Sequence, residues 1–356
     1  MKTIQMKLGQ RSYSIIIEND LIKSLGDYLK NKNTNQKWVI ISQNAIMNHY
    51  GNDLFSQLEE SGFDINKISI DDGEGSKDLN IYTQIISQLL EFNCDRTTII
   101  LALGGGVVGD IAGFVASTYM RGVKYYQIPT TLLAMVDSSI GGKTGLNYLK
   151  TKNIIGTIYQ PDSVLIDPNL LSTLPKSETI SGIGEIIKYG AIKDKGFLTK
   201  LSEWVNDLNN FPFLDAIQRC CEIKAEVVSL DENENDLRRI LNFGHTVGHA
   251  LESHIGYNNI KHGEAISYGM KCSSWISREK GLISDNEYNF MIGIITKLPL
   301  PKLGRINHEE IIQYINFDKK HKNGKLSFIL LNGLGNTKIS TDISKELIYE
   351  SLKVLQ

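Results

Sequence analysis

The sequence predicts an α/β amino-terminal domain built on a mainly parallel sheet, followed by a mostly α-helical carboxyl-terminal domain. The first half alternates short apolar, β-rich runs with helical patterns, which is typical of a sheet covered by helices. The second half shows helical periodicity almost throughout. With 356 residues, 41% of them hydrophobic, the chain is long enough for two cores. We place the domains at residues 1–175 and 176–356.

The strands expected in the first half are nearly continuous apolar runs. They are Trp38–Ser42, Lys67–Ile70, Thr97–Leu103, Tyr125–Pro129 and Ser163–Asp167. The segments between them carry helical patterns: Asp53–Ser61, Leu79–Phe92, Val107–Tyr119 and Thr131–Ile140. Strands without polar alternation are buried on both faces, so the sheet should be open and covered by helices on each side.

The second half is expected to contain six helices and one strand. The helices are Thr179–Ile192, Phe197–Leu208, Leu214–Leu230, Leu237–His254, Gly263–Lys280 and Asp285–Lys297. The strand is Leu326–Leu331. We find no internal repeat and no low-complexity linker, so the two domains should follow each other directly.

Composition excludes several classes of function. Lys and Arg number 38 and Asp and Glu 40, so the net charge of −2 favours neither nucleic acid nor an acidic membrane. The amino terminus has no signal-peptide core, and glycines and Asp110 interrupt the longest apolar stretch, Thr98–Ala116. The four cysteines show no CxxC pairing and suit a reduced, cytoplasmic protein.

A glycine-rich turn follows the third predicted strand. Gly104, Gly106 and Gly109 satisfy G-x-G-x-x-G, which allows a pyrophosphate to approach a helix amino terminus in Rossmann-like domains. The usual acidic residue about 20 positions downstream is absent, and the motif does not follow the first strand. A turn needed only for packing is therefore the alternative. A second glycine turn, Asp72–Lys77, could contact a ribose or phosphate, although alone it would be a loop.

The segment Asp137–Thr144 ends like a P-loop. The P-loop motif requires glycine at position 137, so a nucleotide-cradling role fails on spacing. Asp137 and Lys143 are better interpreted as a charged pair that contacts substrate.

The segment 235–252 gathers polar side chains at helical spacing. Arg238, Asn242, His245, His249 and Glu252 are four, three, four and three residues apart, so one continuous helix would place them on a single face. Such a face would be very costly to bury without partners. The pattern favours an active-site wall that holds a metal and an anionic substrate over a solvated polar face.

Two histidines and a carboxylate from separate elements could form a catalytic zinc site. Glu185 lies three residues before Lys188, and together with His245 and His262 it offers the ligand types of such a site. By analogy with HExxH, spacing alone favours the pair His245 and His249 as the chelate. Distance along the sequence does not decide between the two sets.

Basic residues could bind a phosphate. The candidates are Lys224, Arg238 and the run 318–325, because fork-shaped and point cations together suit a phosphate group. Taken alone, the run is better explained as a solvated basic loop.

Taken together, these motifs resemble the 3-dehydroquinate synthases of the sugar phosphate cyclase superfamily. The resemblance covers nearly the whole chain and is densest at GGGVVGD, GFVASTYMRG, IPTTLLAMVDSSIGGKTGLN, IGTIYQP, GIGEIIKYG, LRRILNFGHTVGH and HGEA. It implies a dehydroquinate synthase-like fold, with an NAD-binding domain and a helical domain that binds metal and substrate. It also implies a homodimer that uses NAD and zinc or cobalt. Gly184 stands where the family more often has alanine.

The resemblance also assigns site residues. The implied metal ligands are Glu185, His245 and His262, which moves His249 from ligand to proton transfer. The implied catalytic residues are His249, Glu234, Lys188 and Lys143. The implied substrate contacts are Arg121, Asp137, Lys143, Asn153, Lys188, Lys224, Arg238, Asn242, His262 and Lys320, of which Arg121 reaches the neighbouring subunit's substrate. The implied NAD contacts are Ser42, Asn44, Asp72, Gly73, Glu74, Gly75, Ser76, Lys77, Gly106, Val107, Val108, Gly109, Asp110, Thr130, Thr131, Lys143, Lys152, Leu170, Leu171, Ser172 and Thr173.

The family chemistry converts 3-deoxy-D-arabino-heptulosonate 7-phosphate to 3-dehydroquinate and phosphate in the shikimate pathway. It proceeds by transient NAD-dependent oxidation, loss of phosphate, reduction, ring opening and an intramolecular aldol. Two alternatives share the NAD and metal motifs, namely another sugar phosphate cyclase and a metal-dependent polyol dehydrogenase of the glycerol type. The dehydrogenase would not need Lys224, Arg238 and Lys320 around a phosphate.

Overall fold

A computed structural model of the chain describes residues 1–33, 35–149, 151–256, 259–321 and 327–355, without the side chains of residues 31–33 and 317–321. The chain divides into two compact units, Met1–Leu174 with Lys224–Asn233, and Pro175–Ile223 with Glu234–Gln356. The segment 224–233 thus groups with the first unit, whereas the sequence analysis placed it in the second domain. The reason is its contacts, since Lys224 pairs with Asp137 and Glu232 pairs with Arg11.

The first unit contains most of the strands. They are β1 (Lys2–Met6), β2 (Tyr13–Ile17), β3 (Lys37–Gln43), β4 (Asp64–Ile70), β5 (Ile99–Gly104), β6 (Lys124–Pro129), β7 (Lys143–Tyr148), β8 (Thr151–Ile158) and β9 (Ser163–Ile166). Its α-helices are α1 (Leu25–Asn33), α2 (Asn44–Ile46), α3 (Asn52–Glu60), α4 (Leu79–Glu91) and α5 (Gly106–Thr118). The helix expected at Thr131–Ile140 is instead largely a π-helical turn, η6 (Ala134–Ser138).

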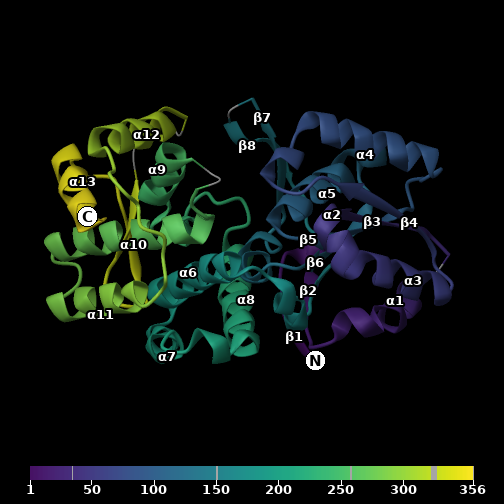
Figure 1. Cartoon of the computed structure of the whole chain (residues 1–356), viewed down its shortest axis with the longest axis horizontal. Coiled ribbons are helices and arrows are strands. Elements are labelled where there is room, and N and C mark those ends of the chain that lie inside the picture. Colours follow the sequence, from purple (N-terminus) through teal and green to yellow (C-terminus); the bar gives the residue numbers. More distant parts are fainter. Residues whose placement is uncertain (34, 150, 257–258, 322–326, 356) are drawn as a thin grey trace. The chain divides into compact units, whose positions relative to one another are not determined.

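Seven strands form one sheet in the order β1-β2-β9-β6-β5-β3-β4. Strands β2, β9, β6, β5, β3 and β4 pair in parallel, and only β1 is antiparallel, so the predicted mainly parallel sheet is confirmed. Helices α4 and α5 lie on one side of it and α1 and α3 on the other (Figure 1). Because β4 and β5 pair with opposite edges of β3, the strand order reverses between β3 and β5, and open α/β sheets bind ligands at such a switch point.

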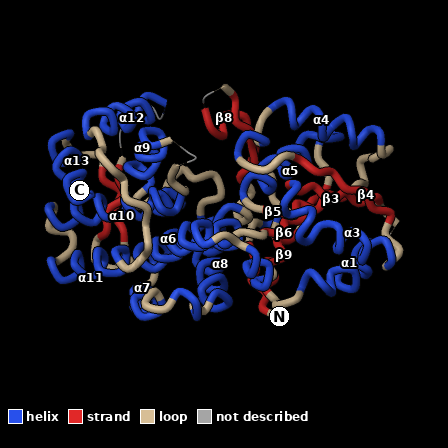
Figure 2. The backbone as a smooth tube through the Cα atoms, in the orientation of Figure 1, coloured by secondary structure: helices blue, strands red, loops and turns tan. Residues whose placement is uncertain are grey.

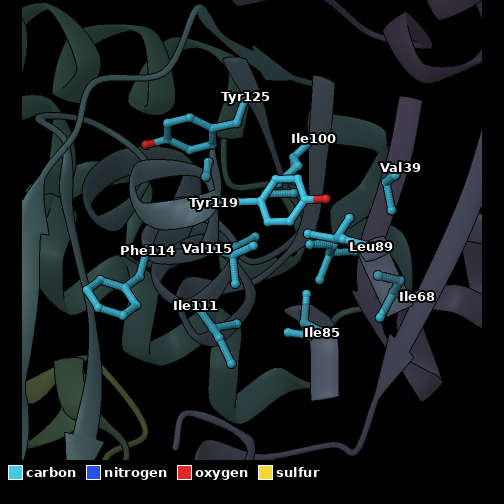
Figure 3. Packing of buried hydrophobic residues seen from close by; sticks show 14 of the residues in the cluster. Val39, Ile68, Ile85, Leu89, Ile100, Ile111, Phe114, Val115, Tyr119 and Tyr125 are labelled. Atoms are coloured by element: carbon cyan, nitrogen blue, oxygen red, sulfur yellow. The ribbon is translucent and has the colours of Figure 1, made fainter. Parts of the chain in front are cut away.

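Alternation along the strands builds the core of the first unit. Val39 of β3, Ile68 of β4 and Ile100 of β5 point toward α4 and α5, where they pack with Leu89 and Val115 (Figure 3). The intervening residues face the opposite side of the sheet. The apolar runs of these strands therefore reflect burial on both faces, as the sequence predicts.

The second unit is mostly helical (Figure 2). Its α-helices are α6 (Lys176–Lys193), α7 (Lys195–Trp204), the first part of α8 (Phe213–Leu230), α9 (His245–Ile255), α10 (His262–Glu279), α11 (Asp285–Thr296), α12 (His308–His321) and α13 (Lys345–Leu352). Strands β10 (Phe328–Leu331) and β11 (Thr337–Ser340) form an antiparallel pair. No helix in the described part of the chain has the length and apolar character needed to cross a bilayer.

The helix expected at Leu237–His254 is broken, so that prediction is wrong. Residues Leu237–Asn242 form a separate 3₁₀ segment, η9, and α9 begins only at His245. Gly244 adopts φ +81°, a left-handed conformation that interrupts the α-helical path. Arg238 and Asn242 therefore do not share one helical face with His245.

Candidate active site

Three side chains of the second unit point their polar atoms at one spot. Glu185 comes from α6, His245 from the first turn of α9, and His262 from the first turn of α10. The Oε1 atom of Glu185 lies 3.7 Å from Nε2 of His245 and 3.6 Å from Nε2 of His262. Ligand atoms about 2.0–2.1 Å from a tetrahedral zinc ion are about 3.3 Å apart, so the spacing fits a divalent metal.

The far side of each imidazole ring fixes which nitrogen faces the cluster. Nδ1 of His245 lies 3.2 Å from the carbonyl oxygen of Phe243, and Nδ1 of His262 lies 3.3 Å from Oε2 of Glu252. Since both partners are acceptors, the neutral form of each ring carries its proton on Nδ1 and directs its Nε2 lone pair at the cluster. Two lone pairs and a carboxylate oxygen therefore converge, an arrangement that is repulsive without a cation.

The carboxylate of Glu185 is fully buried. Its Oε1 accepts no hydrogen bond from any described residue, while Lys188, itself 1% exposed, forms an ion pair with Oε2. A buried acceptor without a donor costs free energy, which a metal at Oε1 would recover. The buried Oε1 of Glu185 therefore supports a metal bound by these three side chains.

His249 is more exposed than the other two histidines and lies beside them. Its ring centroid is 5.3 Å from that of His245 and 5.7 Å from that of His262, and one ligand atom from each of the three lies within 4.8 Å of the others. The structure thus brings His249 near both alternative ligand sets. The hydrogen-bonded orientation of His245 and His262 toward Glu185 favours the set that contains the carboxylate.

Glycines allow the three helices to approach. A Cβ on Gly184 would lie 2.5 Å from the carbonyl oxygen of Gly263, and a Cβ on Gly244 would lie 2.8 Å from that of Ile266. Gly263 also donates its backbone N–H to Oγ of Ser181 at 2.9 Å. Each proposed ligand is therefore adjacent in sequence to a glycine at a close backbone contact. These close contacts explain why glycine, a poor helix former, occupies these three positions.

The surroundings shift the pKa values of His245 and His262 in opposite directions. Burial, followed by the charge of Lys188, lowers the pKa of His245 well below its ordinary value. Burial also acts to lower the pKa of His262, but the hydrogen bond and charge of Glu252 together with Glu185 outweigh it and raise that pKa. His245 is thus held neutral, as a metal ligand must be.

The other predicted site residues of the second unit differ in their surroundings. Glu234 accepts a hydrogen bond from Nδ2 of Asn242 at 2.6 Å, which orients both side chains. Arg238 is buried, with 2% exposure. Lys320 lies in the last turn of α12, and its side chain is outside the described residues.

In the first unit, the residues predicted to bind NAD gather at the carboxyl ends of the parallel strands. Ser42 lies at the end of β3, and the others follow β3 (Asn44), β4 (Asp72–Lys77), β5 (Gly106–Asp110), β6 (Thr130, Thr131) and β9 (Leu170–Thr173). The loops after β3 and β5 flank the switch point, where ligands bind in open α/β sheets. The first N–H groups of α5, at Gly106–Val108, have no acceptor within their own helix and suit an anion.

A polar cluster around the buried side chain of Lys77 connects these loops. The ammonium group of Lys77, 4% exposed, contacts both the carboxylate of Asp110 and Oδ1 of Asn153. Burial raises the pKa of Asp110 despite the opposing charge of Lys77. Glu74 accepts from Nδ2 of Asn147 at 2.8 Å, which links the turn after β4 to β7. Asn153, predicted to contact substrate, thus lies among the predicted NAD contacts.

The remaining predicted residues of the first unit are placed separately. Lys224 donates to both the backbone oxygen and Oδ1 of Asp137, at 2.6 and 2.7 Å. Lys143 is exposed at the start of β7, and Lys152 is half-buried on β8. Arg121 is exposed and adopts φ +69° in the turn after α5.

Two family profiles match adjacent stretches of the chain. Residues 67–181 match the profile described as 3-dehydroquinate synthase N-terminal, and residues 182–321 match that described as 3-dehydroquinate synthase C-terminal. The chain belongs to the 3-dehydroquinate synthase family.

Similar proteins agree over the full length of the chain. The 3-dehydroquinate synthase of Thermodesulfovibrio yellowstonii is 44% identical, covering 97% of this chain and 98% of that protein. The corresponding protein of Clostridium acetobutylicum is 41% identical and covers 100% of both chains. A solved structure of the 2-epi-5-epi-valiolone synthase ValA from Streptomyces hygroscopicus subsp. jinggangensis 5008, with NAD+ and Zn2+ bound, superimposes with a TM-score of 0.86 at 27% identity, covering 96% of both chains.

Two polar contacts of these clusters are not predictable from the sequence motifs. Asn147 bridges Glu74 and the backbone N–H of Asn153, and no motif points to it. Glu252 shows helical spacing with the histidines, but its contact with Nδ1 of His262 depends on how α9 packs against α10. Residue spacing along the chain indicates which face of the helix carries Glu252, but it does not indicate which side chain Glu252 contacts.

Proposed function

We propose that this chain converts 3-deoxy-D-arabino-heptulosonate 7-phosphate to 3-dehydroquinate and phosphate. Membership of the 3-dehydroquinate synthase family over the full chain supports the reaction. The observation that carries the chemistry is the convergence of Glu185, His245 and His262 on one spot. A binding protein without catalytic function would give no reason to bury an acceptor between two imidazole lone pairs.

In this proposal Glu185, His245 and His262 hold a divalent metal, zinc or cobalt. The metal supplies Lewis-acid polarisation of a substrate hydroxyl. Lys188 keeps the other oxygen of Glu185 paired, which directs Oε1 toward the metal. His249 lies at the exposed edge of the cluster and is suited to move a proton at the substrate.

The carboxyl edge of the sheet holds NAD in this proposal. NAD supplies a hydride acceptor that is regenerated within one turnover. The N–H groups at the start of α5 would bind its pyrophosphate, and residues of the turn Asp72–Lys77 would contact it after β4. The ion pair between Lys77 and Asp110 joins the turn after β4 to the first turns of α5. Lys143, Lys152, Thr130, Thr131 and the segment 170–173 are further proposed contacts.

Substrate contacts are proposed in each unit. In the first unit they are Asp137, Lys143, Asn153 and Lys224, and in the second they are Lys188, Arg238, Asn242, His262 and Lys320. Asn242 holds the carboxylate of Glu234, which we propose as a second acid/base group. An arginine and lysines together suit the leaving phosphate.

We also propose a homodimer in which Arg121 completes the neighbouring subunit's site. Exposed apolar side chains of the first unit support a dimer, since Met120 beside Arg121 is 47% exposed, and Leu149 and Ile154 of the β7–β8 hairpin are 88% and 57% exposed. Mixing Arg121→Ala with His249→Ala subunits should restore up to about one quarter of wild-type activity, because each mixed dimer regains one complete site. No recovery after subunit exchange would exclude a shared site. We also propose that the protein works in the cytoplasm, because its four cysteines are free and buried, as in a reducing compartment.

One assay tests the reaction. Phosphate release from the heptulosonate phosphate should require NAD only in catalytic amounts and should stop when a chelator removes the metal. Absorbance from NADH should not rise with product. Stoichiometric NADH with a polyol and no phosphate release would instead identify a dehydrogenase, and release from a different sugar phosphate alone would identify another cyclase.

A further inference from the structure

The carboxylate of Glu252 lies within the α9–α10 packing, where it is 5% exposed. Its Oε2 lies 3.3 Å from Nδ1 of His262, on the opposite side of the imidazole ring from Glu185. The ring of His262 therefore lies between two carboxylates, with one at each nitrogen. A buried carboxylate requires a donor, and the proton on Nδ1 supplies one.

From this geometry we infer that Glu252 is a positioning residue for the metal centre. By accepting the Nδ1 proton it holds His262 in the tautomer whose Nε2 lone pair faces Oε1 of Glu185. It also fixes the rotation of the ring about its side-chain bonds. This inference rests on the proposed metal site and adds a function for a side chain that is not itself a ligand.

The position of Glu252 on α9 strengthens the inference. Glu252 lies seven residues after His245, so two turns of one helix, about 10.5 Å, separate them on the same face. One helix thus contributes His245 directly and orients His262 of the next helix. Any shift of α9 relative to α10 would disturb both histidines together.

The charge of Glu252 agrees with the geometry, because an anion beside Nδ1 favours the form of the ring that carries its proton there. A carboxylate at Nδ1 also makes the imidazole a more basic ligand through Nε2. Loss of such an outer partner typically weakens metal affinity about 10–100-fold.

The test measures zinc affinity by competition with a chromophoric chelator for the full-length wild type, Glu252→Ala and Glu252→Gln. Glu252→Ala should bind zinc about 10–100-fold more weakly. Glu252→Gln is isosteric and keeps an acceptor oxygen, so its loss should be smaller. The matched control is Glu264→Gln, because Glu264 is equally buried on α10 but bonds the backbone N–H of Lys261 at 2.8 Å. The control should bind zinc like the wild type.

A second readout needs neither metal nor activity. In the metal-free protein at alkaline pH, ¹⁵N spectra should show His262 with its proton on Nδ1, and Glu252→Ala should shift the population toward the Nε2–H tautomer. Thermal unfolding checks that each variant folds, and Glu252→Gln carries the test if Glu252→Ala does not. Unchanged zinc affinity and an unchanged tautomer in folded variants would overturn the inference. A wild type that binds no zinc would instead refute the proposed metal site.

Discussion

Replacing Gly263 by alanine tests whether close helix packing positions the metal ligands. A Cβ built on Gly263 would lie 2.6 Å from the carbonyl carbon of Ser181 and 3.0 Å from its Cα, and closer still to its carbonyl oxygen. Carbon atoms pack best about 3.5–4.0 Å apart, so α6 and α10 must separate by about 1 Å or more. Both contacts are backbone, so no side-chain rotation can relieve them.

The expected effect has two parts. Overpacking of this kind destabilises a protein by about 1–3 kcal/mol, measured by urea denaturation. His262 would also move away from Glu185 by about 1 Å, whereas metal–ligand distances tolerate about 0.2 Å. Zinc affinity, measured by chelator competition, should therefore fall by more than about tenfold.

Gly293→Ala is the matched control, because Gly293 lies on α11 with nothing within 4 Å of the added Cβ. Alanine should stabilise that helix by up to about 1 kcal/mol and leave zinc affinity unchanged. If Gly263→Ala behaves like this control in both measurements, the helix contact does not position the cluster and our reasoning is wrong.

Three further predictions concern the ligands, the loops and a helix cap. His262→Ala should abolish stoichiometric zinc, measured by elemental analysis, while His249→Ala keeps it; the reverse pattern would replace the proposed ligand set. Lys77→Met should raise the dissociation constant for NAD and destabilise the fold by about 1–3 kcal/mol at neutral pH, because it leaves the partly buried carboxylate of Asp110 without its cation. Burial already raises the pKa of Asp110, so protonation at acidic pH should relieve the loss of stability in this variant. In urea denaturation, the difference in unfolding free energy from the wild type should therefore grow as the pH rises from about 5 to 8. A difference that does not depend on pH would contradict this prediction. Asp194→Ala should cost about 1–2 kcal/mol of unfolding free energy at unchanged zinc content, because Asp194 caps α7 by accepting from the N–H of Phe197 at 2.9 Å; no loss of stability would exclude a capping role.

The sequence by itself determined the features that depend on local pattern. Continuous apolar runs identified strands such as Trp38–Ser42, because a strand buried on both faces requires apolar side chains at every position. The glycine turn after β5 and the types of the metal-ligating side chains were likewise readable, since tight turns and metal binding limit which residues serve. Whether Glu185, His245 and His262 are the ligands remains a prediction.

Only the tertiary structure decided which distant groups meet. The reversal of strand order between β3 and β5 explains why the glycine turn does not follow the first strand, and no local pattern encodes strand order. The break at Gly244 came from the close approach of α10, where a Cβ would meet the backbone of Ile266, so helical periodicity alone predicted a continuous helix. The contact of Glu252 with His262 depends on the packing of two helices, because a hydrogen bond needs a distance that residue spacing on one helix cannot supply.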